Sequence, residues 1–131
     1  MNIVDSSCWI EYFCNTSIGD AVLPIVERPR ELLVPTIVLY EVCKYLLHKT
    51  SEKNVIAFIQ MMQQGRVIAL DSGLSISAAN VSRKHQLAMA DSIIYATAMQ
   101  YDAVLWTADK HFEGLPQVRY FDKTKCKPEA K

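Results

Sequence analysis

Short apolar runs alternate with longer amphipathic segments along nearly the whole chain. Short continuous apolar runs are typical of strands buried in a parallel sheet, and apolar residues three or four positions apart indicate helices. The alternation therefore predicts an α/β domain with a parallel sheet of about five strands. We expect strands at residues 2–4, 32–34, 67–70, 103–106 and 118–121. We expect helices at about residues 6–13, 18–26, 36–49, 55–62, 74–82 and 90–100, with Thr36 as the cap of the third.

The composition is that of one folded domain. The chain has 131 residues, of which 50% are apolar and only four are glycine. A chain of this size buries roughly two-thirds of the surface that its unfolded form exposes, which is enough for a single core. We therefore expect one domain over residues 1–122, followed by a polar, flexible C-terminal tail at residues 123–131.

The overall charge does not indicate a partner. Lysine plus arginine number 14, as do aspartate plus glutamate, so the net charge favours neither nucleic acid nor a membrane surface. Residues 119–131 hold five basic and two acidic side chains, which we interpret as a solvated tail. No segment approaches the ~18 continuous apolar residues of a membrane helix, and the N-terminus lacks the features of a signal peptide. The sequence thus predicts a cytosolic protein without membrane contact.

We find no sequence motif for a cysteine or histidine metal site, for nucleotide binding or for serine hydrolysis. The cysteines form no C-x-x-C pair, and we interpret them as reduced, mostly buried thiols: Cys8, Cys14, Cys43 and Cys126. The three histidines share no motif, and we interpret each as a surface or core residue: His48, His85 and His111. The chain has no phosphate-binding loop, no dinucleotide fingerprint and no serine-hydrolase elbow.

Two acids follow predicted strands at the same edge of the sheet. Asp5 stands directly after the first strand, and Asp109 stands three residues after the fourth. In an open parallel sheet, ligands bind beyond the carboxyl ends of the strands, where the connections diverge to opposite faces. Asp5 and Asp109 are therefore candidates for a binding or catalytic site.

Two further acids lie in predicted helices, and each has two interpretations. Asp91, at the start of a helix, is either a plain N-cap or a functional carboxylate near the positive end of the helix dipole. Glu41 shares its helix face with apolar residues such as Val38. Glu41 is either the partner of Lys44 in a helix-surface ion pair or a buried carboxylate that needs a metal. The remaining acids are weaker candidates, and Asp71 has the position of a helix cap.

Four stretches of the chain each contain one of these four acids. They are IVDSSCWIEYF, VPTIVLYEVCKYL, LAMADSIIYATA and AVLWTADKHFEGLPQV. In order and spacing they resemble the four acidic motifs of the PIN-domain family, and most closely those of VapC-type toxins of toxin–antitoxin pairs. The likeness extends over nearly the whole chain, from residue 2 to about residue 121.

The resemblance implies a three-layer fold with strand order 3-2-1-4-5 and helices on both faces of the sheet. It matches the four motif acids to Asp5, Glu41, Asp91 and Asp109. It also implies two supporting residues, namely Ser7, two positions after the first acid, and Thr107, before the fourth. The chain departs from the family pattern at His111, where the family often carries a second acid. One bound metal ion is therefore better supported than two.

The function implied by the resemblance is that of a metal-dependent endoribonuclease, with RNA as substrate, a cognate antitoxin as partner and a homodimer as assembly. Clustered carboxylates repel each other unless a divalent cation neutralises them, and hard oxygen ligands favour Mg²⁺ or Mn²⁺. We assign Asp5, Asp91 and Asp109 mainly to metal ligation, and Glu41 to metal or water positioning. Metal-assisted hydrolysis would leave a 5′-phosphate and a 3′-hydroxyl.

Two alternatives belong to other functional classes. One is a catalytically silent PIN-like module that binds RNA or protein, against which stands the presence of all four acids. The other is a receiver-like phosphotransfer domain with Asp71 as phosphoacceptor. That domain needs an acidic pair after the first strand, whereas Asp5 is followed by Ser6 and Ser7.

Overall fold

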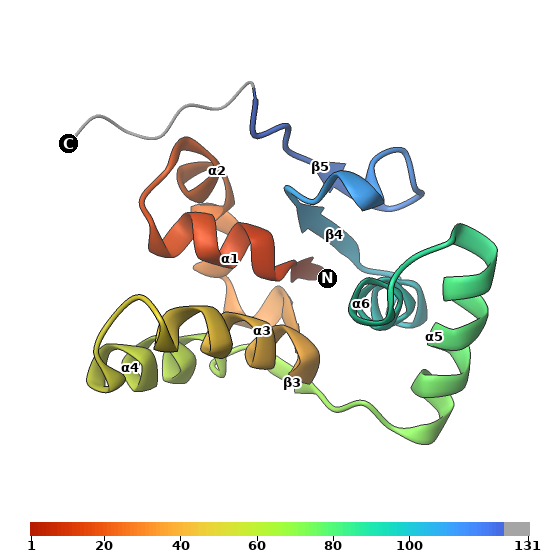
Figure 1. The fold of residues 1–131 in the computed structure, drawn as a ribbon, viewed down its shortest axis with the longest axis horizontal. Coiled ribbons are helices and arrows are strands. Elements are labelled where there is room, and N and C mark those ends of the chain that lie inside the picture. Colours follow the sequence, from red (N-terminus) through yellow and green to blue (C-terminus); the bar gives the residue numbers. More distant parts are fainter. Residues whose placement is uncertain (125–131) are drawn as a thin grey trace.

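The computed structural model describes residues 1–124, and a five-stranded parallel sheet lies at its centre (Figure 1). The strands are β1 (Asn2–Val4), β2 (Leu32–Pro35), β3 (Arg66–Ile68), β4 (Val104–Thr107) and β5 (Val118–Tyr120). Every neighbouring pair is parallel, and the order is β3-β2-β1-β4-β5. The predicted fold class and strand order are confirmed. Most of the expected C-terminal tail, residues 125–131, lies outside the described residues.

Helices form the connections between the strands. They are α1 (Ser6–Phe13), α2 (Ser17–Val26), α3 (Thr36–Leu47), α4 (Glu52–Met62), α5 (Ser72–His85) and α6 (Met89–Gln100), with short 3-10 helices η1 (Pro29–Glu31) and η2 (Lys110–Phe112). The chain moves from β1 through β2 to β3 at one edge, then crosses back past β1 to β4 and β5. Right-handed crossovers that run in opposite directions place their helices on opposite faces, so the sheet has helices on both sides.

Burial along the strands follows their place in the sheet. All four residues of β2 are buried, and so are Ile3 and Val4 of β1. The edge strand β3 exposes two of its three residues.

The described cysteines are free, as expected, although only Cys8 is buried, while Cys14 and Cys43 are half-buried. Within residues 1–124, no helix has the length and apolar character needed to cross a membrane.

Several predicted boundaries were wrong, and strand pairing explains two of them. β3 ends at Ile68 rather than at residue 70, because its only neighbour, β2, ends at Pro35 opposite Ile68. β4 extends to Thr107, which pairs with Tyr120 of β5. Ala103 is not in β4, because its N–H closes α6 by donating to the carbonyl of Ala98.

The boundaries of α3 were also predicted wrongly. Pro35, not Thr36, is its N-cap residue, with extended backbone at φ −61° and ψ 140°. Thr36 is the first helical residue, and α3 has no side-chain cap hydrogen bond. The helix ends at Leu47, two residues before the expected end.

The sheet topology determines where a site can form. β1 and β4 are neighbours at its centre, and the connections after them lead to opposite edges. Asp5 follows β1 and donates its N–H to the carbonyl of Trp106 in β4, at 2.9 Å. Asp109 follows β4 within two residues. The point where the connections diverge therefore carries two of the predicted acids.

We predict that Gly19→Ala destabilises the fold by about 2 kcal/mol, because an added methyl group would collide with backbone. A Cβ on Gly19 in α2 would lie 2.5 Å from the carbonyl oxygen of Glu11 in α1. Gly73→Ala is the matched control, because its Cβ would meet only Asp71 Oδ1, at 3.6 Å. The control should be neutral or stabilising by up to about 1 kcal/mol. Urea unfolding measures both changes, and equal midpoints for the two variants would contradict the prediction.

Candidate metal centre

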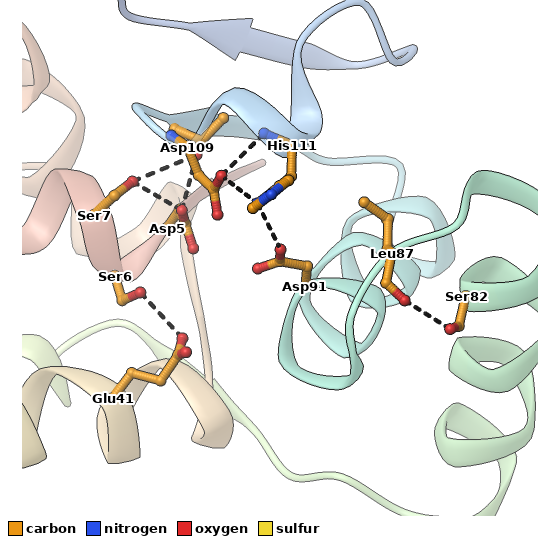
Figure 2. Close-up of polar contacts among 10 residues, drawn as sticks. Asp5, Ser6, Ser7, Glu41, Ser82, Leu87, Asp91, Asp109 and His111 are labelled. Carbon is orange, nitrogen blue, oxygen red and sulfur yellow. Dashed lines mark hydrogen bonds and ion pairs between the residues drawn. The ribbon is translucent and has the colours of Figure 1, made fainter. Parts of the chain in front are cut away.

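The carboxylate of Asp5 is buried and is held by hydrogen bonds from two hydroxyl groups. Only 2% of the residue is exposed. Oδ2 accepts a hydrogen bond from Ser7 Oγ (Figure 2) and another from Thr107 Oγ1, each at 2.8 Å. Although Asp5 occupies the N-cap position of α1, its side chain makes no cap hydrogen bond. The carboxylate is thus oriented by side chains from α1 and β4 rather than used to terminate a helix.

The same two hydroxyl groups tie the segment after β4 to the start of α1. Ser7 Oγ accepts a hydrogen bond from the N–H of Ala108 at 3.0 Å. Thr107 Oγ1 accepts one from the N–H of Asp109 at 2.9 Å. The structure therefore brings the two predicted supporting residues, Ser7 and Thr107, into contact with the two acids that follow β1 and β4.

Asp109 and Asp91 approach each other from different elements, with His111 between them. Asp109 Oδ1 accepts a hydrogen bond from the backbone N–H of His111, at 2.9 Å, and so caps η2. His111 Nδ1 lies 2.9 Å from Asp109 Oδ1 and 3.7 Å from Asp91 Oδ2 (Figure 2). Asp91 lies in the first turn of α6, but the N-cap of α6 is Ala88. The interpretation of Asp91 as a plain N-cap is therefore wrong.

Glu41 reaches the site from α3. Its Oε1 accepts a hydrogen bond from Ser6 Oγ of α1 at 3.0 Å (Figure 2). Among the described residues it forms no ion pair with Lys44, whose Nζ instead lies 5.9 Å from the ring centre of Tyr40. The helix-surface pair is wrong, and the hydrogen bond to Ser6 accounts for the orientation of this half-buried acid.

Burial and the charges of neighbouring acids raise the pKa values of Asp5, Glu41 and Asp91. Burial is the main cause of the raised pKa of Asp5, and it outweighs the hydrogen bonds from Thr107 and Ser7. Burial also raises the pKa of Glu41, with Asp5 and Asp109 adding to the effect. The pKa of Asp91 rises to about 6, chiefly through burial and then through the negative charges of Asp109 and Asp5.

No lysine or arginine within residues 1–124 forms an ion pair with any of these acids, and both ion pairs of the site involve His111. Asp91, Asp109 and His111 each offer a ligand atom, and the three atoms lie within 4.8 Å of one another. Asp5 and Glu41 are outside this closest group. A cluster of one buried and several half-buried carboxylates is ionised most readily around a divalent cation, and its oxygen donors suit Mg²⁺ or Mn²⁺.

Two residues of the site were not identified from the sequence. His111 was interpreted as a surface or core residue, and its side chain is indeed 77% exposed, but Nδ1 faces two of the acids. The available signal was its position two residues after Asp109. Ser6 was noted only as the residue after Asp5, because its contact with Glu41 depends on the packing of α1 against α3.

An acidic crevice at the divergence point of a 3-2-1-4-5 parallel sheet defines a PIN-like domain. The sequence matches the PIN domain family over residues 3–117, and the chain belongs to this family. A search among curated proteins finds no significant match.

Solved structures with the same fold include toxins in complex with antitoxins. The chain is similar to a toxin–antitoxin complex from Klebsiella pneumoniae, with a TM-score of 0.78 and 20% identity over 91% of this chain and 96% of that chain. It is also similar to VapBC2 from Rickettsia felis bound to a promoter DNA fragment, with a TM-score of 0.71 and 11% identity over 92% and 98% of the two chains. A third is VapC20 from Mycobacterium tuberculosis, a sarcin–ricin loop cleaving toxin, with a TM-score of 0.64 and 20% identity over 91% and 99%. At these identities the likeness concerns the fold.

We predict that Asp91→Asn stabilises the metal-free protein increasingly as pH rises from 4 to 7. The folded protein holds a proton on Asp91 up to a pKa of about 6, against an ordinary value of 3.8. The stability linked to this proton is complete below the lower value and is lost as pH rises through the higher one. Near pH 7 the variant should be more stable by about 1–2 kcal/mol.

Thermal melts in chelator across this pH range measure the difference. Asp71→Asn controls for the loss of an aspartate charge, because Asp71 Oδ1 caps α5 by accepting from the N–H of Leu74 at 2.8 Å. An Asp91→Asn variant that differs from the parent by the same amount at every pH would contradict the prediction.

Proposed function

We propose that this protein is a metal-dependent endoribonuclease and the toxin of a toxin–antitoxin pair. The observation that carries the proposal is the approach of Asp5, Glu41, Asp91 and Asp109 to one another from four connections of the sheet (Figure 2), without a lysine or arginine partner in residues 1–124. Membership of the PIN domain family supports nuclease chemistry at this crevice. The similar fold of a sarcin–ricin loop cleaving toxin supports RNA as the substrate class.

Asp5, Asp91 and Asp109 are the proposed ligands of Mg²⁺ or Mn²⁺, and Glu41 binds the metal or positions a water molecule. A bound metal supplies a Lewis acid that polarises the phosphodiester and lowers the pKa of a water. Ser7 and Thr107 hold Asp5 in one orientation and connect it to Asp109 through the backbone of residues 108 and 109. These contacts preorganise the ligands before RNA binds.

Of these two roles for Glu41 we favour the positioning of the attacking water, for which its carboxylate is then the proposed proton acceptor. Ser6 holds its carboxylate at the edge of the crevice, and burial raises its pKa towards the range in which a carboxylate acts as a general base. In the reaction, the water oxygen bonds to phosphorus, the bond from phosphorus to O3′ breaks, and the O3′ leaving group takes up a proton. The products are a 5′-phosphate and a 3′-hydroxyl.

The proposed antitoxin partner has a groove available beside the site. A cavity of about 410 Å³ lies between α1 and α3, next to Glu41, and is lined by Ser6, Ile10, Tyr40, Glu41, Lys44, Tyr45 and His48. Tyr40 is 60% exposed there. An antitoxin segment in this groove would cover Glu41 and block access of RNA. Toxin–antitoxin complexes among the similar structures support this partner, while the homodimer and the cytosolic location stay predictions.

We predict that the purified protein cleaves RNA in the presence of Mg²⁺ or Mn²⁺ and that cleavage stops when a chelator removes the metal. The carboxylates alone supply no Lewis acid to polarise the phosphodiester. The assay compares an RNA hairpin containing the sarcin–ricin loop with an unstructured RNA of equal length. Restored cleavage on adding excess Mg²⁺ or Mn²⁺ is the control for protein damage. Undiminished cleavage in chelator would rule out metal dependence, and no cleavage of any RNA would favour the silent binding module.

We predict that Glu41→Gln lowers the cleavage rate by about 100-fold or more while the protein still folds, because the amide cannot accept the proton from water. The amide oxygen can still accept the hydrogen bond from Ser6. Glu52→Gln is the matched control, since Glu52 is exposed in the first turn of α4. Single-turnover cleavage and a thermal melt are measured for each protein. Parent-like cleavage by Glu41→Gln would remove Glu41 from the reaction.

A further inference from the structure

His111 presents one ring nitrogen to the acidic crevice and the rest of its ring to solvent. Nδ1 is 2.9 Å from Asp109 Oδ1 and 3.7 Å from Asp91 Oδ2, whereas 77% of the side chain is exposed. The backbone of His111 is fixed on both sides. Its N–H donates to Asp109, and the next residue, Phe112, is fully buried. The backbone that carries the ring is therefore fixed in η2, and Nδ1 is within ion-pair distance of both acids.

The two distances from His111 Nδ1 are close to those between ligands of a single ion. With bonds of about 2.1 Å in octahedral geometry, neighbouring ligand atoms lie about 3 Å apart and opposite ones about 4 Å. The two separations from Nδ1, 2.9 and 3.7 Å, fall within this range. All three ligand atoms, from Asp91, Asp109 and His111, lie within 4.8 Å of one another.

We propose that His111 is a nitrogen ligand of the metal and makes the site select Mn²⁺ over Mg²⁺. This inference rests on the proposed function, which supplies the metal. Mg²⁺ prefers oxygen donors and retains its waters, whereas imidazole suits first-row transition metals, whose affinity for nitrogen ligands rises from Mn²⁺ onward. A site in which one imidazole joins the carboxylates of Asp5, Asp91 and Asp109 therefore loses affinity for Mg²⁺ relative to Mn²⁺.

If His111 only forms a hydrogen bond with Asp109, the effect of replacing it differs from the effect expected for a metal ligand. If His111 served only to pair with Asp109, asparagine at position 111 would preserve this role. The asparagine amide can donate a hydrogen bond from nearly the same place as Nδ1. If His111 binds the metal, asparagine removes the nitrogen ligand. The substitution His111→Asn therefore separates the two roles, and its exposed position means that the variant should fold.

The experiment is pulsed electron paramagnetic resonance of Mn²⁺ bound to the full-length protein without an affinity tag. The parent should show modulation from a directly coordinated ¹⁴N nucleus, and His111→Asn should bind Mn²⁺ without it. His48→Asn is the matched control, because His48 is an exposed histidine at the end of α3 and should leave the nitrogen signal unchanged. Mn²⁺ bound to the parent without nitrogen modulation would overturn the inference while leaving a carboxylate metal site and the proposed function intact.

Calorimetric titration with Mn²⁺ and with Mg²⁺ tests the selectivity. Replacing His111 by aspartate supplies an oxygen ligand, so the ratio of the Mg²⁺ to the Mn²⁺ dissociation constant should fall by about tenfold in His111→Asp. An unchanged ratio would overturn the inference. Absence of Mn²⁺ and Mg²⁺ binding by the parent would overturn both the inference and the metal-dependent function on which it rests.

Discussion

Repulsion among carboxylates that are partly or fully buried is the constraint on which the site depends. Asp5, Glu41 and Asp91 all have raised pKa values, with burial as the first cause and neighbouring acids as a further one. Of the described residues, only His111 forms ion pairs with these acids. An arrangement of this kind is unfavourable as a purely structural feature, because buried charges without partners cost stability. It becomes favourable when a divalent cation shares the crevice.

The fold holds this unfavourable arrangement in place. The neighbouring positions of β1 and β4 bring Asp5 and Asp109 to one edge of the sheet, and the hydroxyl groups of Ser7 and Thr107 connect them. Glu41 and Asp91 enter from helices of two other connections, so the site is assembled from elements that are distant in sequence. The hydrogen bonds come from neutral groups, which orient the carboxylates without supplying the positive charge that a metal would provide.

The sequence predicted the architecture well because it depends on periodicity, and it predicted the environments of individual acids less well because they depend on tertiary contacts. Apolar runs located the strands, and their carboxyl ends correctly placed Asp5 and Asp109. Strand ends were missed where a neighbour's length decides them, as at Ile68. Helical spacing alone could not separate the two interpretations of Glu41, since its partner Ser6 is 35 positions away. His111 was missed because only the turn of η2 directs Nδ1 back towards Asp109.

The proposed function requires that Asp5, Asp91 and Asp109 together hold one divalent cation. A crystal of the protein soaked in Mn²⁺ and measured with X-rays near the manganese absorption edge tests this claim directly. We expect an anomalous density peak within about 2.2 Å of carboxylate oxygens from these three residues, and loss of the peak in Asp5→Asn. A crystal with full Mn²⁺ access but no peak between these carboxylates, or with the peak elsewhere on the surface, would contradict it.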